Sequence, residues 1–357
     1  MDYSNNNDNN AKEEEKVAIV KKDTDNNNNN NNNNANANAT TKRTVPVVCP
    51  GHNRPVVEVQ FADTTDGLFH IAASLDSKAM LRSGETGDWI GTFEGHKGAV
   101  WSAKLNSTAT KAATGAADFS VKLWDAITGD QLKTWNNHNH IVKSVAFSYD
   151  DTKLLTAGRD KKAYVIDIEA SMNDDDTNNS DDNNDNNSSN NDDKNISNPF
   201  IHPTAVTKGV WCSEQTIMTG ADDGILRVWD LRSNEIVKSI SSGDKGINDL
   251  ELSYDHEIVT VAAGNKIQFI DTSTFEIVKE HVMKENQKCA SLKPDRKEFL
   301  TAAVEKQWVY LYDFATGEEL SCKKGHHGEV LTVRYSPSGD SYTSGAHDAT
   351  LRLWKME

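Results

Sequence analysis

The chain of 357 residues has few cysteines and no long apolar run. Its four cysteines are far apart and form no C-x-x-C pair, which argues against a disulfide framework or a zinc site and favours reduced thiols. No stretch approaches the roughly eighteen apolar residues of a membrane span, and the polar amino terminus lacks the apolar core of a signal peptide. We therefore expect a protein without a membrane segment, located in the cytoplasm, with the nucleus as a second site. The cysteines are Cys49, Cys212, Cys289 and Cys322.

Basic residues are also in short supply. Lys and Arg number 38 against 54 Asp and Glu, so the formal net charge is −16. The tract Ser171–Asn198 alone contains eight Asp and one Lys, and about −8 remains on the predicted folded part. An acidic body gives no general attraction for nucleic acid, so direct nucleic-acid binding is not expected.

Two segments have almost no apolar residues. Residues 1–44 are mostly Asn, Asp and Lys, with an unbroken Asn run from Asn26 to Asn34, and Ser171–Asn198 is nearly all Asn, Asp and Ser. Neither segment can bury enough apolar surface to offset the entropy lost on ordering. We predict a disordered tail over residues 1–40, one folded domain over 41–357, and a disordered insertion over 171–198 within it.

The rest of the chain contains a repeat of about 42 residues. Segments such as "SVKLWD", "LRVWD" and "VYLYD" recur, and a degenerate earlier copy ends near Ser83. The repeated closing residue falls at Asp125, Asp167, Asp230, Asp271, Asp313 and Lys355, in steps of 42, 63, 41, 42 and 42. Because the long step holds the Asn/Asp tract, there are seven copies, and the third carries the insertion.

Histidines follow the same period. Five of them have a Val four residues later and an Asp 21 to 24 residues later; they are His52, His96, His138, His202 and His326. Each copy divides into short β-rich segments separated by turn signals such as "TGD" and "SPSGD". Four short strands per 42 residues, with GH and WD signatures, resemble the WD-repeat family. The sequence therefore predicts an all-β fold, a seven-bladed WD40 β-propeller.

The resemblance implies a structural role for the recurring side chains. In the family, a loop His, a hydroxyl residue, a turn Asp and a strand Trp form one hydrogen-bonded set. The implied sets are His96, Thr114, Asp118 and Trp124 in copy two; His202, Thr219, Asp223 and Trp229 in copy four; and His326, Ser344, Asp348 and Trp354 in copy seven. Copy three has a partial set of His138, Thr156 and Asp160.

A catalytic interpretation competes with this one, because Ser/Thr, His and Asp also compose the catalytic triad. A catalytic set occurs once, whereas this one recurs at nearly constant spacing. No nucleophile beside a base, P-loop or dinucleotide fingerprint lies outside the repeats, and "GHHGE" around His326 and His327 lacks further ligands at zinc spacing. We expect no catalytic residue, no metal and no cofactor, and hence no enzyme.

The ends of the chain are expected to close the ring. The sequence stops just after Trp354, so copy seven supplies only three strands. The stretch "TKRTVPVVC" has no other place in the repeat count, and we predict a closing strand at about residues 44–49. That strand would leave no open sheet edge. After the insertion, "PFIH" is expected to supply the outer strand of the third blade.

Some stretches are more particular than the blade pattern requires. "TGDWIGTFEGHKGAVW" and "TKAATGAADF" resemble the serine/threonine kinase receptor-associated branch of the WD-repeat family, and the resemblance extends over about residues 45–355. It implies a non-catalytic adaptor, monomeric within a larger complex. The implied partners are the Gemin-type and Sm proteins of the survival-of-motor-neuron (SMN) complex, which assembles spliceosomal ribonucleoproteins for mRNA splicing; a second implied role is in receptor kinase signalling. Those relatives carry an acidic extension that does not follow "LRLWKME" here, so partners of that extension are not carried over.

Two other functions are open. Subunit i of eukaryotic translation initiation factor 3 has a similar "GTFEGHKGAVW"-like copy two, and a substrate receptor of a ubiquitin ligase has no distinguishing motif here. Arg54, Lys97 and Arg159 fall in predicted loops, as rim contacts for a partner or as solvated charges. Trp89 is either a partner anchor or, as we prefer, a residue packed between copies one and two.

Overall fold

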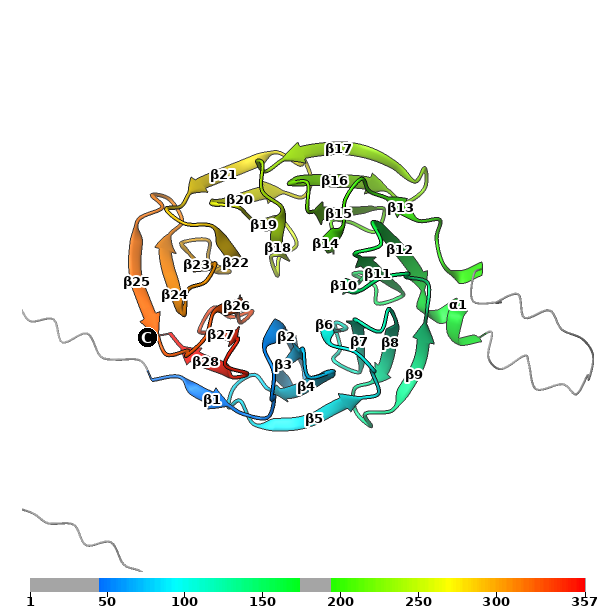
Figure 1. Ribbon diagram of the computed structural model, residues 1–357, viewed down its shortest axis with the longest axis horizontal. Coiled ribbons are helices and arrows are strands. Elements are labelled where there is room, and N and C mark those ends of the chain that lie inside the picture. The colour runs from blue at the N-terminus through cyan, green and yellow to red at the C-terminus, as the bar shows by residue number, and fades with distance from the viewer. Residues whose placement is uncertain (1–44, 174–193, 357) are drawn as a thin grey trace, which may run out of the picture. The chain divides into compact units, whose positions relative to one another are not determined.

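The structure is a computed structural model that describes residues 45–173 and 194–356. These residues form seven four-stranded antiparallel sheets, arranged as blades around a common axis (Figure 1). The 42-residue period therefore does mark one blade per copy, and the predicted seven-bladed propeller is confirmed. Residues 1–44 and 174–193 lie outside the described residues, and they include most of the residues predicted as disordered, 1–40 and 171–198.

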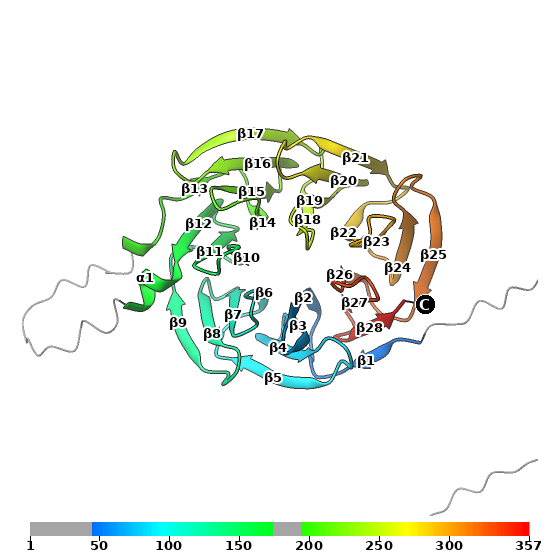
Figure 2. The same ribbon diagram turned by 180° about the vertical axis from the view of Figure 1, so that it is seen from behind.

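In each blade the strands follow one another from the axis outward (Figures 1 and 2). Blades 1 to 3 contain β2 (Val56–Thr64), β3 (Gly67–Ser74), β4 (Lys78–Ser83) and β5 (Trp89–Glu94); β6 (Val100–Leu105), β7 (Lys111–Ala116), β8 (Val121–Asp125) and β9 (Gln131–Trp135); and β10 (Val142–Phe147), β11 (Lys153–Gly158), β12 (Lys162–Asp167) and β13 (Phe200–Ile201). Blades 4 to 7 contain β14 (Val206–Trp211), β15 (Thr216–Ala221), β16 (Ile225–Asp230) and β17 (Glu235–Ser241); β18 (Ile247–Leu252), β19 (Ile258–Ala263), β20 (Lys266–Asp271) and β21 (Ile277–Val282); β22 (Gln287–Leu292), β23 (Glu298–Ala303), β24 (Trp308–Asp313) and β25 (Glu319–Lys324); and β26 (Val330–Tyr335), β27 (Ser341–Ala346) and β28 (Leu351–Lys355), with β1 (Val47–Cys49) as the fourth strand of blade 7.

Blade 7 joins the two ends of the propeller. Strand β1 pairs antiparallel with β28, with Val47 opposite Leu353 and Cys49 opposite Leu351. The Cys49 side chain is buried against this sheet. The fourth strand of the blade thus comes from the start of the propeller, at the residues where the repeat count leaves a strand over, and it covers an edge that would otherwise be open.

The insertion in blade 3 begins later and ends earlier than the sequence predicts. Its first residues belong to a short helix, α1 (Ile168–Asn173), in which the Ser171 hydroxyl donates to the Asp167 carbonyl at 2.5 Å. At the far side Ile196 forms a β-bridge with Ile166. The prediction of disorder is therefore wrong for residues 171–173 and 194–198, because apolar side chains among the polar ones pack on the blade. In the described ranges no helix has the length and apolar character needed to cross a membrane.

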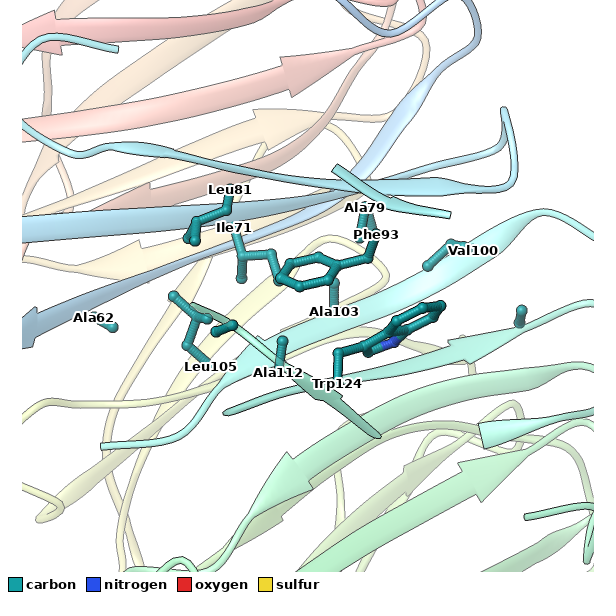
Figure 3. Close-up of a cluster of buried hydrophobic side chains, with 13 residues drawn as sticks. Ala62, Ile71, Ala79, Leu81, Phe93, Val100, Ala103, Leu105, Ala112 and Trp124 are labelled. Atoms are coloured by element: carbon teal, nitrogen blue, oxygen red, sulfur yellow. The ribbon is translucent and has the colours of Figure 1, made fainter. Parts of the chain in front are cut away.

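The core consists of apolar layers between neighbouring blades. Between blades 1 and 2, Phe93 and Ile71 face Trp124, and the small Ala103 and Ala112 leave room for the two sheets to approach (Figure 3). Successive residues of a strand point to opposite faces of its sheet, so a blade covered on both sides is apolar on both. This packing holds the inner strands close around the axis.

Candidate functional site

Blade 2 holds the first of the hydrogen-bonded sets implied by the repeat. The His96 Nδ1 lies 3.0 Å from Asp118 Oδ2, and its Nε2 lies 2.7 Å from Thr114 Oγ1. The Trp124 indole donates to the same Thr114 oxygen at 2.8 Å. An ionised carboxylate can only accept, so Nδ1 carries the hydrogen and Nε2 accepts from the Thr114 hydroxyl. The four side chains thus satisfy one another in a single chain of hydrogen bonds.

The charge states of this set follow from its surroundings. Burial lowers the pKa of His96, which keeps the imidazole neutral near pH 7. Burial alone would raise the pKa of Asp118, but hydrogen bonds from Ser120, the Lys97 backbone and His96 lower it below its usual value. The side chain of His96 is only 1% exposed, so no substrate can reach the ring. The set holds the loop before β6 to the turn between β7 and β8.

Blade 7 repeats the arrangement and blade 3 keeps part of it. His326 lies 3.0 Å from Asp348 and 2.8 Å from Ser344, whose oxygen accepts from Trp354 at 2.9 Å. In blade 3, His138 lies 2.9 Å from both Asp160 and Thr156. Ile166 stands where blades 2, 4 and 7 have Trp, so no indole joins that set. The ring of Tyr164 packs edge-on against His138 instead, with centroids 5.0 Å apart.

Blade 4 departs from the predicted set. His202 and Trp229 both bond to Thr219, at 2.7 and 2.9 Å, but His202 Nδ1 donates to the Phe200 carbonyl at 3.0 Å and not to Asp223. The carboxylate of Asp223 instead takes two hydrogen bonds from Arg227. The inclusion of Asp223 with His202 is therefore wrong. The interval from His to Asp is one residue shorter here than in blades 2, 3 and 7, and the guanidinium offers a two-pronged charged donor.

Blade 1 lacks both the hydroxyl residue and the Trp of the hydrogen-bonded set. His52 lies 2.8 Å from Asp76, yet its Nε2 is buried without a partner because Ala72 occupies the hydroxyl position. Arg82 stands in place of the Trp and donates to the Pro50 and Gly87 carbonyls. Its neighbour His70 is fully buried, and burial followed by the Arg82 charge lowers the pKa of His70 to about 3. Sequence reasoning missed His70, which stands outside the repeating pattern.

Sequence reasoning also missed a cluster of buried charges around the axis. Glu58 on β2 contacts Lys208 on β14 and lies 3.4 Å from Lys104 on β6. Burial would raise the pKa of Glu58, but these two cations lower it to about 2. On the other side Arg334 binds both carboxylate oxygens of Asp249 at 2.7 Å. The sequence does contain a sign of this cluster, because charged residues occupy the third and fifth positions of inner strands that are expected to be buried on both faces.

Glu58, Lys104, Lys208 and Arg334 line a cavity of about 450 Å³, together with other residues of the inner strands and of the loops that follow them. Two of those loops meet across it. The Tyr149 ring stacks on His256 with centroids 4.3 Å apart, and the Tyr149 hydroxyl donates to the Trp211 carbonyl at 3.0 Å. Burial raises the pKa of the nearby Glu251 to about 7, although Arg334 opposes the rise. Among the described residues no three His, Cys, Asp or Glu side chains are grouped so as to hold a metal ion.

The predicted rim residues lie at the surface. Arg54, Lys97 and Arg159 are all exposed in the loops or turns at the ends of blade strands. Trp89 begins β5 and is 60% exposed, with its indole donating to Thr92 at 2.9 Å. Our preferred interpretation of Trp89 as packed between blades 1 and 2 is therefore wrong. Strand β5 is the outermost of its blade, so no further strand covers that side chain.

Comparison with known proteins agrees with this architecture. The family described as "WD domain, G-beta repeat" matches residues 87–125, 129–167, 200–230 and 317–355. Each match runs from the outer strand of one blade through the third strand of the next. The serine-threonine kinase receptor-associated protein of Rattus norvegicus is 43% identical over 314 residues, which are 88% of this chain and 83% of the relative. The chain belongs to the serine-threonine kinase receptor-associated protein family.

A more distant member and a neighbouring family mark the limits of the likeness. The serine-threonine kinase receptor-associated protein of Dictyostelium discoideum is 38% identical, over 87% of this chain and 98% of the relative. Subunit I of eukaryotic translation initiation factor 3 from Schizosaccharomyces pombe is 27% identical, over 86% of this chain and 95% of the relative. As a WD-repeat member of the receptor-associated family, the protein is a scaffold of the kind that binds other proteins.

Proposed function

We propose that this protein is a non-catalytic adaptor in an SMN-type complex, where it assists the loading of Sm proteins onto spliceosomal RNAs in the cytoplasm. Its 43% identity to a receptor-associated relative over 88% of the chain carries the proposal. The word "kinase receptor-associated" in the relatives' name adds a role as a modulator of receptor kinases. Partner binding, with no reaction of its own, is the activity that this function requires.

The distribution of polar groups supports an adaptor. The histidine sets that resemble catalytic triads are enclosed and internally satisfied, with the ring of His326 only 1% exposed. The exposed Trp89, in contrast, presents a large amphipathic side chain, and such residues often anchor protein interfaces. Lys97 and Arg159 add exposed positive charge on loops of blades 2 and 3. We propose these residues as partner contacts, together with Arg54 in blade 1.

Affinity purification of the tagged full chain from cells of its own species, followed by mass spectrometry, tests the proposal. Recovery of Gemin-type and Sm proteins is expected, from the cytoplasmic fraction above all. The second candidate is a subunit of initiation factor 3, favoured by 27% identity along most of the chain, and it predicts recovery of initiation-factor subunits. Recovery of neither group would refute both functions.

A matched pair of variants locates the contact surface. Trp89→Ala removes the exposed aromatic, and we expect partner recovery to fall roughly tenfold or more, as for an interface anchor. Val278→Ala is the control, because Val278 is 52% exposed on another outer strand, β21. Equal recovery by the two variants, with unchanged melting temperatures, would remove Trp89 from the interface and leave the adaptor function in place.

A further inference from the structure

One residue near the start of each inner strand stands outside the regular pairing. In every inner strand a β-bulge lies at the second residue. The first and third residues pair with the neighbouring strand, whereas the second residue has no partner there. These residues are Val57, Trp101, Lys143, Thr207, Asn248, Lys288 and Leu331. They surround the axis at the end where the inner strands begin, and a bulge there re-aims the side chain that it carries.

Three cations gather at this end of the axis without an ion pair. The Lys143 ammonium lies 3.2 Å from the centre of the Trp101 ring. Within the described ranges, Lys143, Lys288 and Arg159 make no salt bridge through their side chains. Burial, and then the charges of Lys208, Arg159 and Lys288, lower the pKa of Lys143 to about 7, while the charge of Asp222 opposes them. The four residues Trp101, Lys143, Arg159 and Lys288 are called the mouth cluster below.

A second observation at the same place concerns the indole. The Nε1 of Trp101 is buried and has no hydrogen-bond partner. A buried donor without a partner is costly, and so is a set of cations that repel one another. One anionic group with acceptor oxygens would relieve both costs, because it would accept from the indole and pair with the ammonium groups.

We propose that the mouth cluster binds an acidic segment of a protein partner, with carboxylates between Lys143 and Lys288 and within reach of the Trp101 indole. The proposal rests on the adaptor function and gives its partner a chemistry. A peptide is favoured over nucleic acid because the chain carries a net charge of −16, which repels an extended polyanion, whereas a short acidic segment needs only the local cluster. The four residues of the mouth cluster belong to blades whose inner strands surround the centre of the ring (Figure 1).

Fluorescence anisotropy with the full-length protein and a labelled peptide tests this. The probe is a tetra-glutamate flanked by Gly and Ser, and its tetra-glutamine counterpart is the control peptide. We expect binding of the glutamate peptide alone, weakened by added NaCl, and a loss of affinity of tenfold or more in Lys143→Gln and in Lys288→Gln. Lys355→Gln should bind as the wild type does, since Lys355 lies at the end of blade 7 where the inner strand finishes, opposite to the end where the inner strands begin.

A gentler variant protects the test against misfolding. Trp101→Phe keeps an aromatic ring under Lys143 but removes the N–H, and it should weaken binding several-fold without changing the melting temperature. Absence of binding to the wild type, or equal binding by Lys143→Gln, would overturn the proposal. Tighter binding of a single-stranded RNA of equal charge would also overturn it. If the double variant Lys143→Gln/Lys288→Gln recovers the same cellular partners as the wild type, the role of the mouth cluster is refuted and the adaptor function stands. If the wild type itself recovers none of the expected partners, the adaptor function is refuted.

Discussion

Replacing Asp118 by Ala is a direct test of the hydrogen-bonded set in blade 2. The Asp118 carboxylate accepts from the His96 ring at 3.0 Å and from the Lys97 backbone N–H at 2.8 Å. It also accepts from the Ser120 hydroxyl at 2.7 Å and from the Ser120 N–H at 3.1 Å. Alanine removes all these acceptors and leaves the His96 Nδ1–H without its carboxylate partner.

The expected loss follows from which donors can reach water. The Asp118 side chain is 15% exposed, so the donors of Lys97 and Ser120 can be hydrated at the surface, whereas the His96 ring is only 1% exposed. After the substitution only the neutral Ser120 oxygen, 3.2 Å away, remains for the His96 Nδ1–H. A hydrogen bond to a charged group contributes about 1.5–3 kcal/mol, and we expect the free energy of unfolding to fall by about 2 kcal/mol. The pKa of Asp118 is lowered in the folded state, so its stabilisation is present above the unfolded-state pKa of about 4 and is lost as the pH falls below it. The gap between wild type and variant should therefore narrow in acid.

Urea denaturation at pH 7, followed by circular dichroism and tryptophan fluorescence, measures the difference. Asp125→Ala is the matched control, because it removes a carboxylate in the same blade that accepts from Ile127 and Thr128 in an exposed turn. We expect a smaller effect from it. An Asp118→Ala protein within about 0.5 kcal/mol of the wild type would refute the reasoning, since that is the range of ordinary surface substitutions.

The remaining predictions concern the axis, a buried histidine and the closing strand. Glu58→Ala should lower the free energy of unfolding by about 3–5 kcal/mol in urea denaturation, because it leaves the largely buried Lys104 and Lys208 without their anion; a loss below about 1 kcal/mol would contradict this. His70 has its pKa lowered to about 3, so its stabilisation is present above the unfolded-state pKa of about 6.5 and declines as the pH falls toward 3. The free energy of unfolding of His70→Leu, compared with that of the wild type, should therefore be about 2 kcal/mol more favourable at pH 5 than at pH 8. Melting curves with the same pH dependence as the wild type would argue against this. Deletion of Thr41–Cys49 removes β1 and should abolish cooperative unfolding in calorimetry, whereas deletion of Met1–Ala37 should not; equal transitions would show that β1 does not close the ring.

Features that recur with the 42-residue period could be predicted, and features that occur once could not. The spacing of His, hydroxyl, Asp and Trp predicts the sets around His96 and His326 because blades 2 and 7 fold these loops in the same way. The same spacing fails at Asp223, where a shorter interval and the guanidinium of Arg227 alter the partner. A periodic pattern describes an average blade, and a single competing side chain is enough to change the local pairing.

Exposure was harder to predict than strand position. The pattern places Trp89 on a strand, and Trp89 does begin strand β5. This strand lies at the outer edge of blade 1, however, where no further strand covers the side chain. The polar composition of 171–198 predicts disorder, yet Ile196 and neighbouring residues pack on blade 3. Composition averages over a segment, whereas burial depends on one apolar side chain meeting an apolar surface.

The sequence by itself determined the number of blades, the set of strands in each copy and the need for a closing strand near Cys49. These depend on local periodicity and on the rule that a sheet edge must be covered. Only the tertiary structure decided which charges meet at the axis. Glu58 and Lys208 are 150 positions apart in the chain and come into contact because closure of the ring brings seven inner strands together. The same closure places Lys143, Arg159 and Lys288 near one another, with no salt bridge to any of them among the described residues, and no pattern within a single repeat records that arrangement.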